Sequence, residues 1–214
     1  MLMNVLDVIL IVLVLLNFYC LGATRLNALI TAVGIQGVLL GLLPLVVDQA
    51  LRAELIVSAV LASSIKGFLF PYLLFRAMRE AEIRREVEPI IGFVCTLLLG
   101  AIGTAAAIVL SRSLPLVDEF ARSLLVPAAL SMILSGFLLL VSRKKAITQV
   151  VGYLILENGI FLFDLTLVSA FPFVVELGML LDLFVAVFVM GIILHHIQRT
   201  FSSLDTTHLT ALRG

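Results

Sequence analysis

The sequence contains no tryptophan, three tyrosines and only two cysteines among its 214 residues. Two thiols far apart in sequence, Cys20 and Cys95, make neither a disulfide framework nor a cysteine-rich metal site, so we interpret both as structural. Glycine-rich phosphate loops, a nucleophile elbow and cysteine pairs with cluster spacing are also absent. These absences leave no visible site for ATP hydrolysis or redox chemistry. They predict a chain without a cofactor or a metal of its own.

Charge of one sign is not in excess either. The formal net charge is zero, which gives no reason to expect a nucleic-acid partner. Apolar residues are what the sequence has in abundance: 62% of it is hydrophobic and the mean hydropathy is +1.24. A soluble domain is typically about 45–50% apolar. The composition therefore predicts an integral membrane protein in contact with lipid.

Hydrophobic stretches of about 20 residues, the length that crosses a bilayer, recur along the whole chain. We predict an all-α protein whose seven transmembrane helices cover residues 2–21, 29–47, 55–76, 90–110, 123–141, 147–169 and 173–197. The first stretch lacks a basic start, carries Asp7 and continues as a full-length span, so we do not expect a cleavable signal. The longest connection, Arg76 to Pro89, mixes Arg and Glu and is interpreted as a solvated loop or a helical extension.

The basic residues orient this bundle. With the N-terminus outside, ten Lys and Arg residues fall in inner segments and three in outer loops, while Lys66 lies inside a span. Cytoplasmic loops carry such an excess of Lys and Arg. The sequence therefore predicts an outer N-terminus and a cytoplasmic C-terminus.

Six ionisable side chains lie within the predicted spans: Asp7, Lys66, Glu157, Asp164, Glu176 and Asp182. A charge at bilayer depth costs at least about 2.5–3.5 kcal/mol on insertion scales, so each must be paired, hydrated or useful. A rise of about 1.5 Å per residue places Lys66, Glu157 and Asp182 near the midplane, on three different helices. Asp164 shares the Glu157 face nearer the outer surface, and Glu176 lies close to the outer interface.

A Lys–Glu pair in hydrocarbon can exchange protons because burial and the partner's charge shift each group's proton affinity in opposite directions. Lys66 with Glu157 is interpreted either as such a pair or as a static ion pair that fixes packing. The Pro71 ring disrupts the bond to the Gly67 carbonyl beside Lys66. Glu176 and Asp7 are interpreted as solvated or as path residues. His195 and His196, at the inner boundary, are candidate proton-entry residues or ordinary interfacial residues, and no third metal ligand accompanies them.

Several motifs resemble those of the hydrogenase-4 component E family, small membrane subunits of formate hydrogenlyase-type and related hydrogenase complexes. They are VGYLILENG at 151–159, VELG at 175–178, DLFVAVFVM at 182–190 and LTALRG at 209–214, with SIKG at 64–67 in the third span. The last three spans in turn resemble complex I subunit K and, more distantly, the C component of multisubunit sodium/proton antiporters. Glu157 matches the second-helix glutamate of subunit K, and Asp182, with Glu176 as a rival, stands for the third-helix one.

The resemblance implies three parts: a four-helix N-terminal extension (1–117), a subunit K-like domain (118–200) and a cytoplasmic tail (201–214). It implies a multi-pass subunit of a bacterial or archaeal cell (inner) membrane, not an enzyme by itself. Its expected partners are antiporter-like membrane subunits and a [NiFe]-hydrogenase-like redox module. Glu157 is expected to be the central proton-exchanging acid, Asp182 its relay partner and Lys66 a tuning partner or relay. A purely structural spacer and an independent small ion transporter are the two alternatives.

Overall fold

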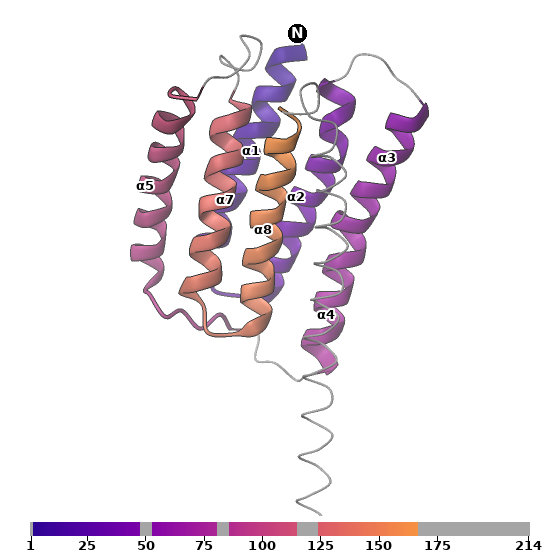
Figure 1. Cartoon of the computed structure of the whole chain (residues 1–214). Coiled ribbons are helices and arrows are strands. Elements are labelled where there is room, and N and C mark those ends of the chain that lie inside the picture. Colours follow the sequence, from indigo (N-terminus) through magenta and orange to yellow (C-terminus); the bar gives the residue numbers. More distant parts are fainter. Residues whose placement is uncertain (1, 48–52, 81–85, 115–123, 167–214) are drawn as a thin grey trace, which may run out of the picture.

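The computed structural model describes residues 2–47, 53–80, 86–114 and 124–166, which form a bundle of long helices (Figure 1). The elements are α1 (Leu2–Gly22), α2 (Leu26–Val47), α3 (Ala53–Ser64), the π-helix η1 (Ile65–Leu69), α4 (Phe70–Glu80), α5 (Phe93–Ser111), α7 (Leu125–Ser142) and α8 (Ala146–Asp164). Within these ranges, six helical stretches are long and apolar enough to cross a membrane. The first six predicted spans are confirmed in this sense. The predicted seventh, 173–197, lies outside the described residues.

The third span is one continuous rod made of three pieces. α3 passes directly into the π-helical turn η1, and η1 passes directly into α4. The only proline of this rod, Pro71, is the second residue of α4. Because proline has no N–H, an α-helix cannot keep its regular bonds through the preceding turn. The irregularity therefore falls beside Lys66, where the position of the proline predicts it.

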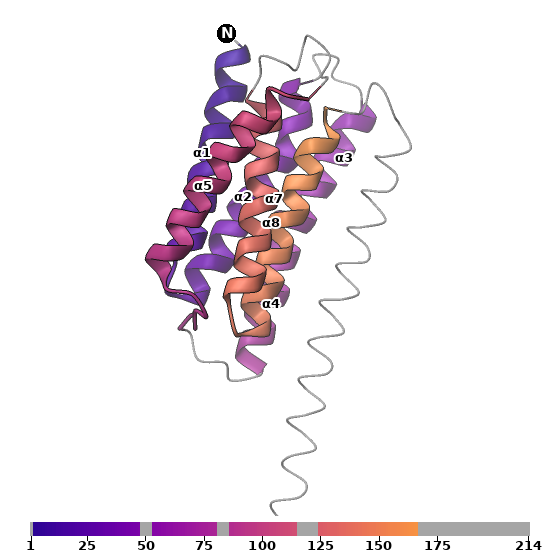
Figure 2. The same ribbon diagram turned by 60° about the vertical axis from the view of Figure 1, so that its left-hand side comes forward.

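Four helices form the centre of the bundle. α1 packs on α2 and α7, and α8 packs on α2 and α7, so that the four enclose a common interior. α5 packs on the outside of α1 and α7, and the α3–η1–α4 rod packs against α2 on the other side. Figures 1 and 2 show this order, with α5 and the rod on opposite flanks.

The apolar core is divided into two clusters along the length of these helices. Toward one end, the first cluster includes Leu21, Leu29, Leu139 and Ile155. Toward the other end, the second cluster includes Leu13, Leu40, Met132 and Leu162. Each of the four central helices contributes one residue to each of these sets. The two apolar clusters are therefore separated by a layer of residues that crosses the interior of the bundle.

The segment before α5 ties two helical connections together. The Val87 N–H donates to the Thr24 carbonyl between α1 and α2 at 2.9 Å, and the Ile90 N–H donates to the Ser142 carbonyl at the end of α7 at 2.7 Å. Lys145 adds an ion pair to Glu88 at 3.1 Å. The connection predicted to be a solvated loop or a helical extension is helical as far as Glu80 and, from Glu86, is hydrogen-bonded to the end of the bundle.

Arg143 follows α7 and is completely buried, although arginines in connections between helices usually face water. Its Nη2 donates to the Leu21 carbonyl at 2.5 Å, and its guanidinium lies 4.7 Å from the centre of the Phe93 ring. Carbonyls in the last turn of a helix lack intrahelical donors and attract cations. Arg143 therefore caps α1 and joins it to α5 and α7, while burial lowers the pKa of its guanidinium.

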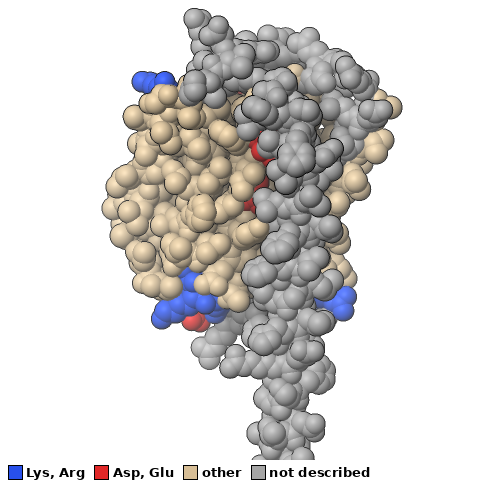
Figure 3. Space-filling model, viewed as in Figure 1, with Lys and Arg blue, Asp and Glu red and all other residues tan. Residues whose placement is uncertain are grey.

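Basic side chains gather at one end of the described bundle (Figure 3). The connections at that end carry Arg25, Lys144 and Lys145, and α4 ends there with Arg76 and Arg79. At the opposite end, α5 is followed by Arg112. The ribbon thus places most of the described basic residues at the end that their distribution along the sequence predicts to be cytoplasmic.

Candidate functional site

The structure brings together two of the predicted site residues from distant parts of the chain. Lys66 Nζ lies 2.7 Å from Glu157 Oε1, although 91 positions separate them in sequence. Only 4% of the lysine side chain and 2% of the glutamate side chain are exposed. The two groups therefore form a buried, charge-assisted hydrogen bond between the third and the sixth span.

An aromatic ring completes the surroundings of the lysine. Phe161 lies one helical turn beyond Glu157 on α8, and its ring centre is 4.7 Å from Lys66 Nζ. A ring at this distance attracts a cation through its quadrupole, and the attraction is stronger where water is excluded. One face of α8 thus offers the ammonium a carboxylate and a π-system.

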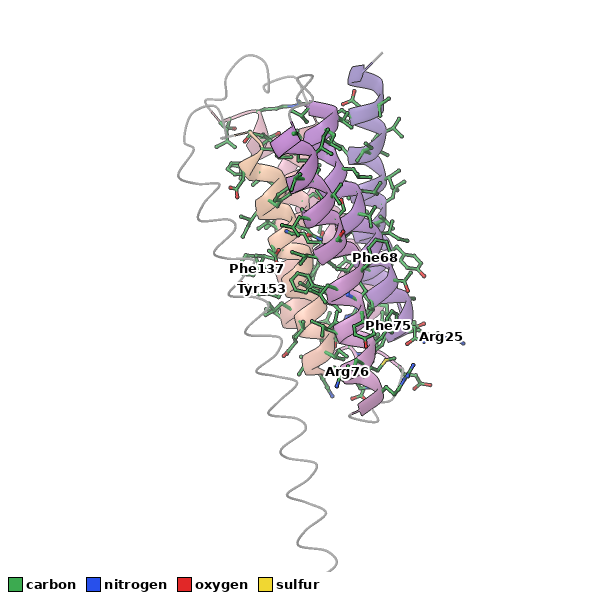
Figure 4. The ribbon with its side chains drawn as sticks, turned by 90° about the vertical axis from the view of Figure 1, so that its right-hand side faces the viewer. Arg25, Phe68, Phe75, Arg76, Phe137 and Tyr153 are labelled. Carbon is green, nitrogen blue, oxygen red and sulfur yellow. The ribbon has the colours of Figure 1, made fainter. Side chains whose placement is uncertain are left out.

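Lys66 reaches this face from the π turn. The Phe70 N–H donates to the carbonyl of Ile65, five residues earlier, which makes the turn wider than an α-helical one. Within this turn, Lys66 is buried whereas Phe68 is 69% exposed, so the two side chains leave the rod on different sides. Figure 4 shows Phe68, Phe75 and Arg76 following one another along the rod toward the end where Arg25 lies.

Glycines let the helices around the pair approach backbone to backbone. On α7 and α8, a Cβ added to Gly159 would lie 2.7 Å from the Ile133 nitrogen, and one added to Gly152 would lie 2.8 Å from the Leu140 nitrogen. A Cβ on Gly136 would meet the backbone of Leu156, next to Glu157. Small residues at helix crossings serve this purpose in membranes. The α7–α8 contact beside the acid is therefore too close for larger residues.

The ion pair belongs to a polar layer between the two apolar clusters. Asn17 of α1, Gln36 of α2 and Ser135 of α7 are buried at about the same level of the bundle as Glu157 of α8. Gln36 Nε2 donates to Asn17 Oδ1 at 2.8 Å. Each central helix therefore contributes a polar residue between the clusters, and Lys66 adds a fifth.

Sequence reasoning missed Asn17 and Gln36 because amides cost less than charges in an apolar span. A signal was available, since each is a strongly polar side chain within an almost wholly apolar stretch. The sequence could not show that the two side chains face one another.

Of the remaining candidates, the structure describes Asp164 and Asp7. Asp164 is buried and ends α8, two turns and about 10 Å of helix rise beyond Glu157. Asp7 is half-buried near the start of α1. Glu176, Asp182, His195 and His196 lie outside the described residues. In the part of the chain that the structure describes, no group of three or more His, Cys, Asp or Glu residues could hold a metal ion.

Comparison with known proteins identifies relatives over most of the chain. The sequence is 31% identical over 163 residues to hydrogenase-4 component E of Escherichia coli K12, which covers 75% of this chain and 74% of that protein. The chain belongs to the hydrogenase-4 component E family. The same identity and coverage hold for the protein of that name in Shigella flexneri. It is also 32% identical over 194 residues to "Uncharacterized protein Rv0085" of Mycobacterium tuberculosis, across 88% of this chain and 86% of that protein.

The family membership predicted from the motifs is therefore confirmed. The relatives' name describes one component of a hydrogenase, in agreement with the prediction that a member of this family is a subunit rather than an enzyme by itself. No family model and no solved structure matches the sequence.

Proposed function

We propose that this protein is a membrane-arm subunit of a proton-translocating, hydrogenase-type complex, and that Lys66 and Glu157 form part of its proton path. The relatives' name and the helical membrane architecture support the first half of the proposal. The buried pair supports the second half. A single observation carries it: an ammonium and a carboxylate lie 2.7 Å apart, in helices of transmembrane length and almost out of contact with solvent.

A buried ion pair is a costly way to hold two helices together. Removing two charges from water costs several kcal/mol per ion, and their mutual attraction recovers this only in good geometry. Apolar residues of similar volume would hold α8 against the rod at least as well. A pair that titrates as a unit does what apolar residues cannot do, because it changes which group holds the proton when water or a neighbouring charge arrives.

The polar layer supports a proton connection that runs parallel to the membrane plane at this depth, rather than one that crosses the membrane. Asn17, Gln36 and Ser135 extend polar character from the ion pair across the central helices, while apolar clusters lie on either side along the bundle. Groups that can bind water in such a layer stabilise protons at mid-depth without opening a passage from one end to the other. We therefore assign the N-terminal helices a share of the path.

The resemblance to hydrogenase-4 component E and, in the last three spans, to complex I subunit K supplies the proposed partners. Antiporter-like membrane subunits would adjoin this chain, and a [NiFe]-hydrogenase-like module would carry out the electron transfer. Glu157 is the proposed central acid and Asp182 its relay partner. Asp164 and Glu176 rank second, and His195 and His196 are proposed proton-entry residues at the inner boundary. We also propose seven spans, an outer N-terminus and a cytoplasmic C-terminus in the inner membrane.

The test is Glu157→Gln in the complex purified in mild detergent with its co-purifying subunits. We expect the complex to assemble and to retain redox turnover, while most of the proton translocation per turnover is lost in reconstituted vesicles. Glu86→Gln is the matched control, because it makes the same chemical change at an exposed position at the end of the bundle. Full coupled translocation by an assembled Glu157→Gln complex would contradict the proposed path. Activity of the chain alone, with no co-purifying subunit, would instead favour the small-transporter alternative.

A further inference from the structure

The backbone of Lys66 rests against a glycine of the neighbouring helix. A Cβ built on Gly37 would lie 2.6 Å from the Lys66 carbonyl carbon and 2.7 Å from both its oxygen and its Cβ. Cβ atoms essentially never approach other heavy atoms below 3.0 Å. No side chain at position 37 fits unless α2 or the π turn moves.

We propose that Gly37 is a positioning residue for the Lys66–Glu157 pair. By leaving room for the wide turn, it holds the rod in the π-helical register that directs the ammonium to α8. This inference rests on the proposed function of the pair and names the residue of another helix that maintains it.

The hydrogen bonds of the turn define its register. The Phe70 N–H reaches the Ile65 carbonyl, and Pro71 has no N–H with which to restore an α-helical bond. The widened turn contains one residue more than an α-helical turn, and one residue corresponds to roughly 100° of rotation. If the turn tightened, residues before and after it would rotate relative to one another by about this angle. The Lys66 side chain and the α4 side chains could then not both point in their present directions.

The neighbouring glycines of α2 provide an internal comparison. Gly34, Gly37 and Gly41 lie on one face of α2, at spacings of three and four residues. A Cβ on Gly34 would meet the Pro71 ring at 2.9 Å, and one on Gly41 would lie 2.6 Å from the Ser63 nitrogen. All three permit the close approach of α2 and the rod, but Gly37 is the one whose added Cβ meets Lys66.

The charged groups near the pair are few in the described ranges. α2 and α7 contain no ionisable side chain, η1 contributes Lys66, and α8 contributes Glu157 and Asp164 as charged groups. α4, which packs against η1, carries Arg76, Arg79 and Glu80 toward its far end. Displacement of Lys66 therefore removes the cation that lies 2.7 Å from Glu157. A buried carboxylate that loses its cation takes up a proton, because burial disfavours the charged form.

The experiment is infrared spectroscopy of the full chain in lipid vesicles at neutral pH, which detects the carbonyl band of a protonated buried carboxyl. Lys66→Met should show this band, and its loss in Lys66→Met/Glu157→Gln assigns it to Glu157. We expect Gly37→Ala to produce the same band and Gly41→Ala not to produce it. The Gly41 substitution adds the same methyl group to the same helix face, one turn away and against Ser63 rather than Lys66.

Pro71→Ala provides a second variant that adds no volume to the helix contact. The substitution restores the missing N–H and favours the tighter turn. It should therefore also produce the carbonyl band of protonated Glu157. If Lys66→Met shows the band while Gly37→Ala and Pro71→Ala retain the wild-type spectrum, the positioning role is wrong. A band of equal size in Gly41→Ala would also overturn it, since general disturbance of the helix contact would then suffice. Coupled translocation by Glu157→Gln tests the proposed function separately, so the two ideas can fail independently.

Discussion

At the scale of single residues, the ion pair shows what a membrane interior requires of a charge. The Lys66 and Glu157 side chains are 4% and 2% exposed, and each finds in the other the opposite charge that its burial demands. The Phe161 ring contributes further attraction to the lysine at 4.7 Å. A static packing device and a proton-exchanging pair share this geometry, but they respond differently to the removal of one charge.

Removal of one charge or of both distinguishes the two roles. In a proton-exchanging pair the remaining partner can become neutral when the other is removed. We therefore expect Lys66→Met and Glu157→Gln each to assemble. Each should lower the free energy of unfolding by less than the roughly 3–5 kcal/mol that is typical of breaking a static buried pair. We expect the double variant to remain uncoupled as well. The measurements are stability in detergent, recovery of the complex and proton translocation. Failed assembly of each single variant, together with an assembled and fully coupled double variant, would show that the pair serves packing alone.

At the scale of elements, glycines and one proline decide how the helices meet. The α7–α8 contact uses Gly136, Gly152 and Gly159 to bring backbones together next to Glu157. The α2–rod contact uses another glycine face beside the π turn. Polar groups of the backbone must be satisfied within the protein in lipid, and the widened turn does so in part through the bond from the Phe70 N–H to the Ile65 carbonyl.

Enlargement of Gly136 tests the importance of the α7–α8 contact. Gly136→Ala places a methyl group against the Leu156 backbone, which cannot rotate away, and should destabilise the protein by about 1–3 kcal/mol, as overpacking does. Gly92→Ala is the control, because nothing lies within 4 Å of its added Cβ and its stability should stay within about 0.5 kcal/mol of wild type. Unfolding by denaturing detergent measures both. Equal stability of the two variants would mean that α7 and α8 can separate without cost.

At the scale of the whole molecule, charge divides the bundle into two unlike ends. Arg25 and Arg76 lie at one end (Figure 4), where the connection from α7 to α8 carries Lys144, and Arg112 follows α5 at the other. Arg143 and the segment from Glu86 bind the connections of the first end to one another. The same end therefore combines the basic excess expected of a cytoplasmic surface with an ordered backbone.

Cysteine labelling tests this orientation. With Cys20 and Cys95 replaced by alanine, we expect Arg112→Cys to react with a membrane-impermeant thiol reagent added to intact cells. Lys144→Cys should react only after the membrane is opened. Both positions are exposed, so accessibility to the reagent differs only through the side of the membrane. The reverse pattern would place the N-terminus inside.

Hydropathy was sufficient to predict six of the helices because a transmembrane length of apolar residues has few other structures available. Spacing was sufficient to place Lys66 and Glu157 at similar depth, since helix rise converts sequence position into height. Neither hydropathy nor spacing was sufficient to show that Arg143 is buried. Loop cations usually face water, and the carbonyl and ring that receive this guanidinium come from α1 and α5, far away in sequence.

The sequence by itself determined the membrane class, the approximate extent of the described spans and the presence of charged residues within them, because each depends on composition or local periodicity. Its motifs also indicated the family. Only the tertiary structure decided which groups meet. The Lys66–Glu157 bond, the Asn17–Gln36 bond and the contact of Gly37 with the π turn all join different helices. Such contacts depend on the rotation of each helix about its axis, and that rotation is set by packing against neighbours rather than by the residues of one helix.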